Sequence, residues 1–322
     1  MIQNNINKKN NTLFHPKFII TIIIFLLFSV GNVKADPKVV TSIKPIHSLV
    51  SNVMDGVGTP YLIITDTASP HSFTLKPENA SQLEDADLVF WIGEEVESFL
   101  VKPLESVALL ARKVSFMESD RIIKLKFREN NIFESHKHHD EHDEHEGHDG
   151  HHHGEFDSHI WLDPMNAKEM VLIIADELSY IDPSNKNIYV QNANETILKL
   201  DKLIHETEES LNTNISFVVF HDAYQYFENR FDVASSGALT VNTDALPGAR
   251  QVSDIRELIE EDNISCILSE PQFNPKIIET IASDTEIATG VLDPIGATLS
   301  EGKEQYFSLI KDIVSNLNQC GR

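Results

Sequence analysis

Three histidines lie far apart in the chain, each beside a short apolar run. His71 lies in a turn after one such run, His159 precedes a triplet that resembles a strand, and His221 directly follows the run 217–220. Ligands of parallel α/β sheets bind outside the carboxyl ends of the strands. His221 is well placed for this position, and His71 and His159 can plausibly reach it. Three imidazoles with one open or oxygen-filled position fit a tetrahedral Zn²⁺ site. On spacing alone, each histidine could equally be a capping or core residue.

Asp293 is the candidate for a fourth, oxygen ligand. It follows a short apolar run at 289–292 that predicts a strand, so it can reach the same sheet edge. We expect its carboxylate either to complete the metal shell or to anchor a ligand from behind. His47, in the first turn of a predicted helix, and His205, on a long polar helix, are interpreted as structural and solvated residues.

A segment at 135–155 consists almost wholly of His, Asp, Glu and Gly. It has no apolar periodicity, so we expect an unordered loop on the first domain. Its histidines and acids offer many mixed nitrogen and oxygen sites, each weak and quickly exchanging because no frame holds them. The alternative is a solubilising low-complexity segment. The nine candidate accessory ligands are His136, His138, His139, His142, His145, His148, His151, His152 and His153.

Residues 1–35 have the pattern of a secretory signal peptide. Lys8, Lys9 and Lys17 precede an apolar run too short to span a bilayer comfortably, and a small-residue site predicts cleavage after Ala35. A single membrane anchor is the alternative. We therefore expect an exported, periplasmic protein.

The formal net charge is −24, and the signal segment holds four Lys and no acid, so the mature chain is more negative still. This charge argues against nucleic acid or an anionic membrane as a partner and suits a protein that attracts cations.

Cys266 and Cys320 are the two cysteines of the chain. In an oxidising compartment two lone cysteines are natural disulfide partners. Two buried free thiols are the alternative. A zinc site on these cysteines is disfavoured, because nothing near either one has ligand spacing.

Strand-like and helical runs alternate through the chain, which predicts α/β lobes with mainly parallel sheets. The run 183–212 has helical apolar spacing and no internal Gly or Pro, so it predicts one long helix that connects two lobes. We expect an N-terminal lobe at 36–182, this bridging helix, and a C-terminal lobe at 213–322. The predicted strands are 39–43, 61–65, 88–92, 217–220, 266–269 and 289–292, and the further helices are 46–54, 77–84, 253–261, 276–282 and 305–317.

At this point the chain resembles a known family, the periplasmic zinc-binding components of high-affinity zinc ABC transporters. The match covers essentially the whole mature chain. It is carried by TSIKP at 41–45, ASPH at 68–71, ADLVFWIG at 86–93, HIWLDP at 159–164, VFHDAYQYF at 219–227, PGA at 247–249, SEPQF at 269–273 and LDP at 292–294.

The resemblance implies two α/β lobes bridged by a long helix, with Zn²⁺ bound in the cleft between them by His71, His159 and His221. Some zinc members carry Glu just before the first ligand, where this chain has Pro70, so that carboxylate is excluded. Manganese members place Glu at the position of His221, and a set of three imidazoles favours Zn²⁺ over Mn²⁺. The resemblance also implies delivery of zinc to an ABC permease, and we expect the protein to be a monomer. Because a long bridging helix resists hinge closure, we expect a modest domain shift on release, with loops bearing His159 or His221 moving.

Two other functions compete with zinc delivery. A zinc hydrolase is disfavoured, because the chain has no H-E-x-x-H helix and no carboxylate spaced as an obvious general base, so we expect no enzyme. A periplasmic zinc buffer or adhesin without a transport role is the other alternative. Zinc-limited growth of a deletion strain separates it from transport.

Overall fold

The computed structural model describes residues 35–128, 130–133, 155–241, 247–285 and 287–320. The predicted signal peptide, apart from Ala35, and the predicted His-rich loop, apart from Glu155, lie outside these residues. Residues Pro37–Arg322 form one compact unit. The helices of the described ranges are each too short or too polar to cross a membrane.

The first sheet contains four parallel strands in the order β2-β1-β3-β4. Its central strands are apolar runs buried on both faces, as parallel sheets covered by helices require. The strands are β1 (Val39–Thr41), β2 (Tyr61–Leu62), β3 (Leu88–Trp91) and β4 (Arg112–Ser115), and the helices between them are α2 (Lys44–Val53), α3 (Pro77–Glu84) and α4 (Ser98–Ser106).

The second sheet repeats this topology, with parallel strands in the order β6-β5-β7-β8. The α/β prediction is therefore confirmed for both lobes. The strands are β5 (Phe217–His221), β6 (Gly237–Thr240), β7 (Cys266–Ser269) and β8 (Ala288–Val291), and the helices are α7 (Gln225–Phe231), α8 (Ala249–Glu261), α9 (Lys276–Thr285) and α10 (Gln305–Cys320).

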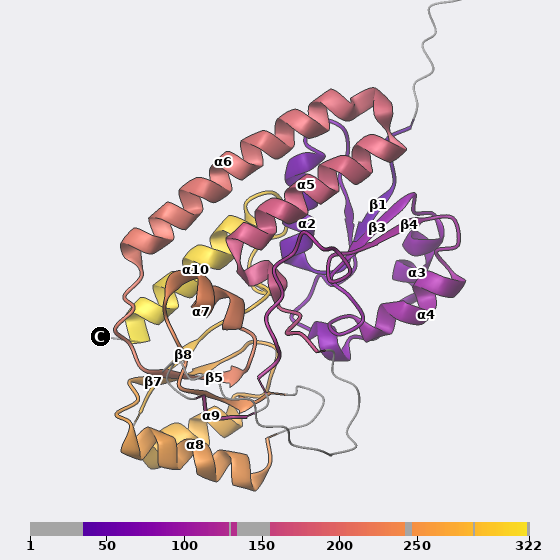
Figure 1. Ribbon diagram of the computed structural model, residues 1–322. Helices are drawn as coiled ribbons and strands as arrows, with labels where there is room; N and C mark the ends of the chain where they lie inside the picture. Colours follow the sequence, from indigo (N-terminus) through magenta and orange to yellow (C-terminus); the bar gives the residue numbers. More distant parts are fainter. Residues whose placement is uncertain (1–34, 129, 134–154, 242–246, 286, 321–322) are drawn as a thin grey trace, which may run out of the picture. The chain divides into compact units, whose positions relative to one another are not determined.

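Two long helices lie between the sheets in sequence, α5 (Pro164–Ile181) and α6 (Lys186–Ser210). Asp163 caps α5, since its carboxylate accepts a hydrogen bond from Met165 N, and Pro164 occupies the first turn. A 3-10 turn, η3 (Pro183–Asn185), precedes α6, so the observed helix is slightly shorter than the predicted range 183–212. Figure 1 shows α6 running alongside α5 and onward past α10 to the second sheet, which confirms the bridging helix.

The two lobes share one hydrophobic core. On β5, Phe217 and Val219 belong to the large cluster that also contains the first sheet, α5, α6 and α10. Val218 and Phe220 point the other way, into a smaller cluster with α8 and α9. This alternation follows from the two faces of a strand. The lobes are therefore joined by packed apolar side chains as well as by the bridging helix.

Residues 120–128 lead away from the first lobe, and residues 131–133 contact the second. Asn131 donates from its side chain to the backbone of β6, and Phe133 N donates to Ser236 O at 3.0 Å. A Cβ atom at Gly237 would lie 2.6 Å from Asn131 O, so this close approach requires glycine there. Within the N-terminal lobe that the sequence predicts at 36–182, residues 131–133 lie on the edge of the second sheet.

A second connection runs back from the C-terminal lobe through the loop between β8 and α10. The buried Lys44 amine on α2 donates to the carbonyl oxygens of Ala297 and Leu299 at 2.5 and 2.9 Å. Tyr306, on α10, donates its hydroxyl to Trp161 O at 2.7 Å. These buried polar contacts tie α10 and its loop to the first lobe.

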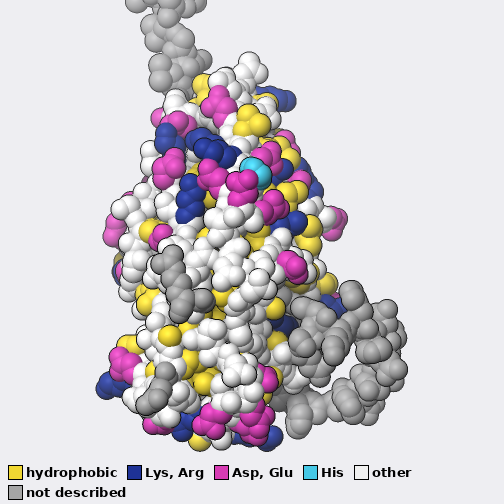
Figure 2. Space-filling view, turned by 90° about the vertical axis from the view of Figure 1, so that its left-hand side faces the viewer, with side chains coloured by type: hydrophobic (Ala, Val, Ile, Leu, Met, Phe, Trp, Pro, Cys, Tyr) yellow, Lys and Arg dark blue, Asp and Glu magenta, His cyan; other side chains and the backbone are white. Residues whose placement is uncertain are grey.

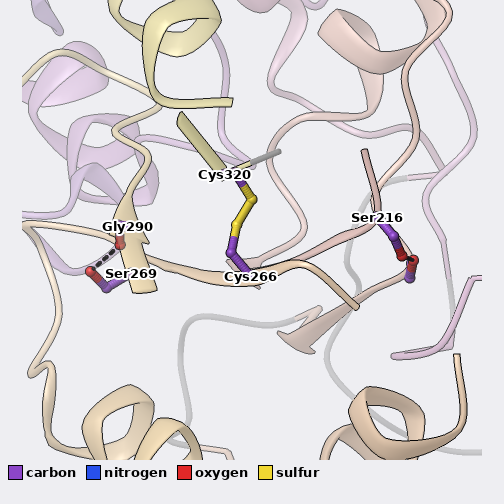
Figure 3. The surroundings of a disulfide bond; sticks show 6 residues. Ser216, Cys266, Ser269, Gly290 and Cys320 are labelled. Carbon is purple, nitrogen blue, oxygen red and sulfur yellow. Dashed lines mark hydrogen bonds between the residues drawn. A yellow bond between two sulfur atoms is a disulfide. The ribbon is translucent and has the colours of Figure 1, made fainter. Parts of the chain in front are cut away.

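The predicted disulfide is present. Cys266, the first residue of β7, is bonded to Cys320, at the end of α10, with a Cα–Cα distance of 5.6 Å (Figure 3). On the same strand, Ser269 donates to Gly290 O of β8 at 3.0 Å. The bond closes a loop with a sequence separation of 54 and fixes the C-terminal helix to the sheet.

The outer face of α6 carries mixed charges. Figure 2 shows acidic and basic side chains interspersed on its upper part rather than gathered into a patch of one sign. Lys202 and Lys311 both lie within 3.4 Å of Glu206, and Lys168 lies 2.5 Å from Asp201. Because exposed pairs of this kind are screened by water and salt, they contribute little to stability.

Candidate metal centre

His71, His159 and His221 converge. One ligand nitrogen from each lies within 4.8 Å of the other two, and the three rings have centroid distances of 5.1 to 6.0 Å. His159 Nε2 and His221 Nε2 are 3.2 Å apart. Within the described ranges, this is the group in which at least three donor side chains could share a metal ion.

His221 is the last residue of β5 and is buried. Its Nδ1 lies 2.6 Å from Glu270 Oε1, and its backbone N–H donates to the same oxygen at 3.3 Å. A carboxylate accepts, so Nδ1 carries the proton and the Nε2 lone pair is left for a metal. Burial alone would lower the pKa of His221, but Glu270 outweighs it and raises that pKa above the ordinary value.

His159 is held in the same way by a residue of its own segment. Its Nδ1 lies 2.7 Å from Asp157 Oδ1, and its backbone N–H donates to that oxygen at 2.9 Å. His159 directly precedes a 3-10 turn, η2 (Ile160–Leu162). The prediction that residues 160–162 resemble a strand is therefore wrong. The turn buries Trp161, whose indole N–H donates to Pro294 O at 2.8 Å, and this contact positions the turn against the second lobe.

His71 has a different support. It lies in a 3-10 turn, η1 (Pro70–Ser72), on the segment that follows β2, and its side chain is only partly buried. Pro70 occupies the first position of the turn, where its fixed backbone angle suits the conformation. His71 is thus brought to the site by a turn on the first lobe, while His221 ends a strand of the second.

The pocket around the three rings is small and mostly apolar. Its volume is about 10 Å³, room for about one water-sized particle. Trp161, Phe273, Pro294 and Ile295 form apolar walls, and Gln272 adds an amide. A site of this size and lining suits a single ion with few waters.

Asp293 lies behind the pocket wall. Its carboxylate accepts from the backbone N–H groups of Ile295, Gly296 and Ala297 at 2.6 to 3.2 Å, and from Gln272 Nε2 at 2.8 Å. It does not belong to the three-histidine group. These bonds hold the loop at 293–297 beside the pocket, and the role of Asp293 as fourth ligand or as anchor stays a prediction.

The other predicted residues lie away from the pocket. The nine histidines at 136–153 are outside the described residues. His47 is buried on α2, with Nε2 3.2 Å from Pro60 O, and exposed His205 lies 3.4 Å from Glu209 on α6. Both placements agree with the structural and solvated roles expected for them.

A partly buried arginine supports the residue next to His221. Arg128 donates to both oxygens of the Asp222 carboxylate and, at 2.9 Å, to Glu228, and its guanidinium lies 3.8 Å from the Phe133 ring centroid. Partial burial would lower the pKa of Arg128, but Glu228 and Asp222 outweigh it and raise that pKa. None of these residues was expected in this role from the sequence.

Comparisons of the sequence with known proteins match the chain to one family. The family model described as the periplasmic zinc-uptake complex component A, ZnuA, matches residues 39–320. The high-affinity zinc uptake system protein ZnuA of Brucella abortus (strain 2308) is 43% identical over 303 residues, covering 88% of this chain and 91% of that protein. The protein of the same name from Yersinia pestis is 32% identical, covering 89% and 92%.

Solved structures show the same fold. A crystal structure of ZnuA superposes with a TM-score of 0.73 at 21% identity, covering 89% of this chain and 100% of that one. A laminin-binding adhesin from Streptococcus agalactiae superposes with a TM-score of 0.69 at 23% identity, with the same coverage. At these identities the structural likeness is one of fold.

Proposed function

We propose that this chain, which belongs to the ZnuA family of periplasmic zinc-uptake components, captures Zn²⁺ and delivers it to the permease of a zinc ABC transporter. The observation that carries the proposal is the convergence of three imidazoles within 4.8 Å, two of them held by buried carboxylates. Zinc is the cargo of this site.

The donor set supports zinc over harder ions. Imidazole nitrogen suits Zn²⁺, whereas Mn²⁺ and Mg²⁺ prefer carboxylate, carbonyl and water oxygens. Asp157 and Glu270 each accept a hydrogen bond from the Nδ1–H of a histidine, and this increases the basicity of the metal-facing nitrogen. We propose a tetrahedral shell of His71, His159 and His221 with one oxygen, from water or from a carboxylate, for which Asp293 is the candidate.

A carrier is a better interpretation of the site than a hydrolase. A catalytic zinc needs an open position and a group that can accept a proton from its water. Asp157 and Glu270, beside the pocket, each hold a ligand histidine through one oxygen. That supporting role, together with the match to a zinc-uptake family, supports a protein that binds and releases zinc without chemistry.

The remaining parts of the proposal follow from the sequence. Residues 1–35 direct export and are removed after Ala35, and the mature protein acts as a monomer in the periplasm. The nine histidines at 136–153 supply weak accessory sites that raise the zinc concentration near the main site. If so, deleting 137–153 reduces the zinc bound at high metal and leaves one tight calorimetric isotherm nearly unchanged.

The test of transport is a deletion strain grown with zinc chelated. The wild-type gene and the matched control His205→Ala should restore growth and uptake of radioactive zinc, whereas His71→Ala, His159→Ala and His221→Ala should not. Added zinc should rescue all strains. Uptake that is normal without the protein would leave a buffering role and contradict delivery to a permease.

A further inference from the structure

The two buried histidines of the metal centre face each other with their unprotonated nitrogens. Asp157 and Glu270 each accept a hydrogen bond from the Nδ1–H of one histidine, so both Nε2 atoms present lone pairs to the pocket. The Nε2 atoms of His159 and His221 are 3.2 Å apart. Because two lone pairs carry like partial charges and repel each other, the surrounding structure must hold the pair at this distance.

The distance between the two nitrogens matches a tetrahedral zinc ion. Two nitrogens that each lie about 2.0–2.1 Å from such an ion are about 3.3 Å apart at the tetrahedral angle. The observed 3.2 Å agrees with this value. A larger ion of the same charge, such as Cd²⁺, has longer bonds to nitrogen and needs a wider pair. The contacts that fix this spacing therefore affect which ion the site prefers.

Helix α7 is tied closely to His221, which precedes it in the chain. Arg128 donates at 2.9 Å to the carboxylate of Asp222, the residue after His221, and at 2.9 Å to Glu228 of α7. Ala223 N also donates to His221 O at 2.9 Å, so the connection from β5 to α7 is a short, bonded turn. His221 and α7 therefore form one unit.

Tyr226, on α7, holds the start of the segment that bears His159. Its hydroxyl donates to Asp157 O at 2.6 Å and accepts from Leu125 N at 2.9 Å. Tyr226 and Asp157 are both buried, so water does not readily replace a bond lost here. Because the Asp157 carboxylate holds His159, the Tyr226 hydroxyl acts on this ligand through its support.

Arg230, also on α7, holds the end of the same segment. Its Nε and one terminal nitrogen donate to the two carboxylate oxygens of Asp163 at 2.7 and 2.8 Å. Asp163 directly follows η2 and caps α5. Paired bonds between a guanidinium and a carboxylate fix orientation as well as distance. Helix α7 therefore holds the segment 157–163 at both of its ends.

We propose that Tyr226 and Arg230 are positioning residues that keep His159 and His221 at the spacing of a zinc tetrahedron, and so favour Zn²⁺ over larger divalent ions. The inference rests on the proposed zinc function. Neither residue belongs to the described lining of the metal pocket, so each acts through the segment 157–163 and not on the ion. Without these bonds the two nitrogens can move apart, which weakens zinc binding more than Cd²⁺ binding.

The experiment is chelator competition on the full chain with Zn²⁺ and with Cd²⁺, each below one equivalent so that the tightest site fills first. Arg230→Gln and Tyr226→Phe should each weaken zinc binding about tenfold, the lower end of the effect of residues that support a ligand. Cd²⁺ binding should weaken less. The ratio of the Cd²⁺ to the Zn²⁺ dissociation constant should therefore fall severalfold in both variants.

Two matched control variants remove similar bonds away from the pocket. Arg112→Gln breaks a paired contact between a guanidinium and the Glu177 carboxylate of α5. Tyr189→Phe removes a buried hydroxyl that donates to Asp182 at 2.9 Å. Both controls should keep the wild-type affinities for the two ions, because neither residue contacts the segment 157–163 through these bonds.

Three results would overturn the proposal: unchanged zinc affinity in Arg230→Gln, equal losses of Zn²⁺ and Cd²⁺ affinity, or equal losses in the control variants. Arg230 is 29% exposed, so its variant is expected to fold even if Tyr226→Phe does not. Failure of the proposed zinc function gives a different result, since the wild type itself would then bind zinc weakly. Failure of the present inference alone leaves tight zinc binding in the wild type.

Discussion

Two of the three site histidines differ from the third in how the protein holds them. His159 and His221 are buried, and each has both its Nδ1 and its backbone nitrogen within 3.3 Å of a single carboxylate oxygen. His71 lies partly exposed in a short turn of the first lobe. The site therefore combines a fixed pair of ligands with a ligand on a more accessible turn.

Zinc release needs the site to open. The shared core and the bridging helix resist a wide swing of the lobes, so we expect a local movement. From the bridging helix we expect the loops bearing His159 or His221 to move, and this stays a prediction.

Removing a ligand should have the largest effect. His221→Ala leaves two imidazoles, and we expect the zinc affinity to fall by about 10²-fold or more, beyond the effect of losing a supporting residue. Competition with a chromophoric chelator measures this. His205→Ala, on the exposed face of α6, is the control and should bind like the wild type. Full zinc affinity in His221→Ala would show that His221 is not a ligand.

Replacing a supporting carboxylate should have the next largest effect. Asp157→Asn and Glu270→Gln keep the shape of the side chain but weaken its hold on the histidine, so we expect a loss of about 10–100-fold. Asp85→Asn, at an exposed ion pair with Lys38, is the matched control. Normal zinc binding by both variants would show that the two carboxylates do not hold His159 and His221 in place for the metal.

Acid should weaken zinc binding at all three ligands. Each imidazole must be neutral to bind, and its ordinary pKa is about 6.5, so affinity should fall steeply below about pH 6.5. Glu270 raises the pKa of His221, so protons compete there already at higher pH. In Glu270→Gln the fall should begin at lower pH. Chelator competition between pH 8 and 5 tests this, and an unchanged profile would count against the role of Glu270.

The disulfide should matter least to zinc. Cys266 starts β7, and Glu270 follows the other end of that strand, so the bond lies away from the pocket. Replacing both cysteines by serine should lower the free energy of unfolding by about 4 kcal/mol on the chain-entropy model. Zinc affinity should stay within about twofold, as for independent sites. A large loss of affinity in the folded variant would show that the site depends on the C-terminal helix.

The strands and helices that the sequence predicted are those with clear apolar patterns. Strand β4 was missed because Arg112 and Lys113 are exposed at the sheet edge and leave no apolar run. Strand β6 was missed because it is short and begins with Gly237. Helix α5 was missed because Met165 and Leu172 are apolar but lie outside its buried stripe, which blurs the helical pattern.

The residue types at the site were predictable, but their supports were not. Histidine chemistry and the family motifs indicated the three ligands. The partner of His221 lies 49 residues away, just after β7, the strand next to β5, and only the fold brings it near. Asp157 could have been predicted from the sequence, since an acid two residues before a ligand histidine is a local signal. The role of Asp293 stays a prediction, because its backbone partners depend on a loop conformation that the sequence does not reveal.

The most direct test of the three-histidine site is the zinc X-ray absorption spectrum of the chain without residues 137–153, loaded with one equivalent of zinc. The account predicts three imidazole ligands at about 2.0–2.1 Å and one oxygen. In His71→Ala the same spectrum should retain two imidazoles. A wild-type spectrum with sulfur ligands, or with one imidazole among oxygens, would contradict the account.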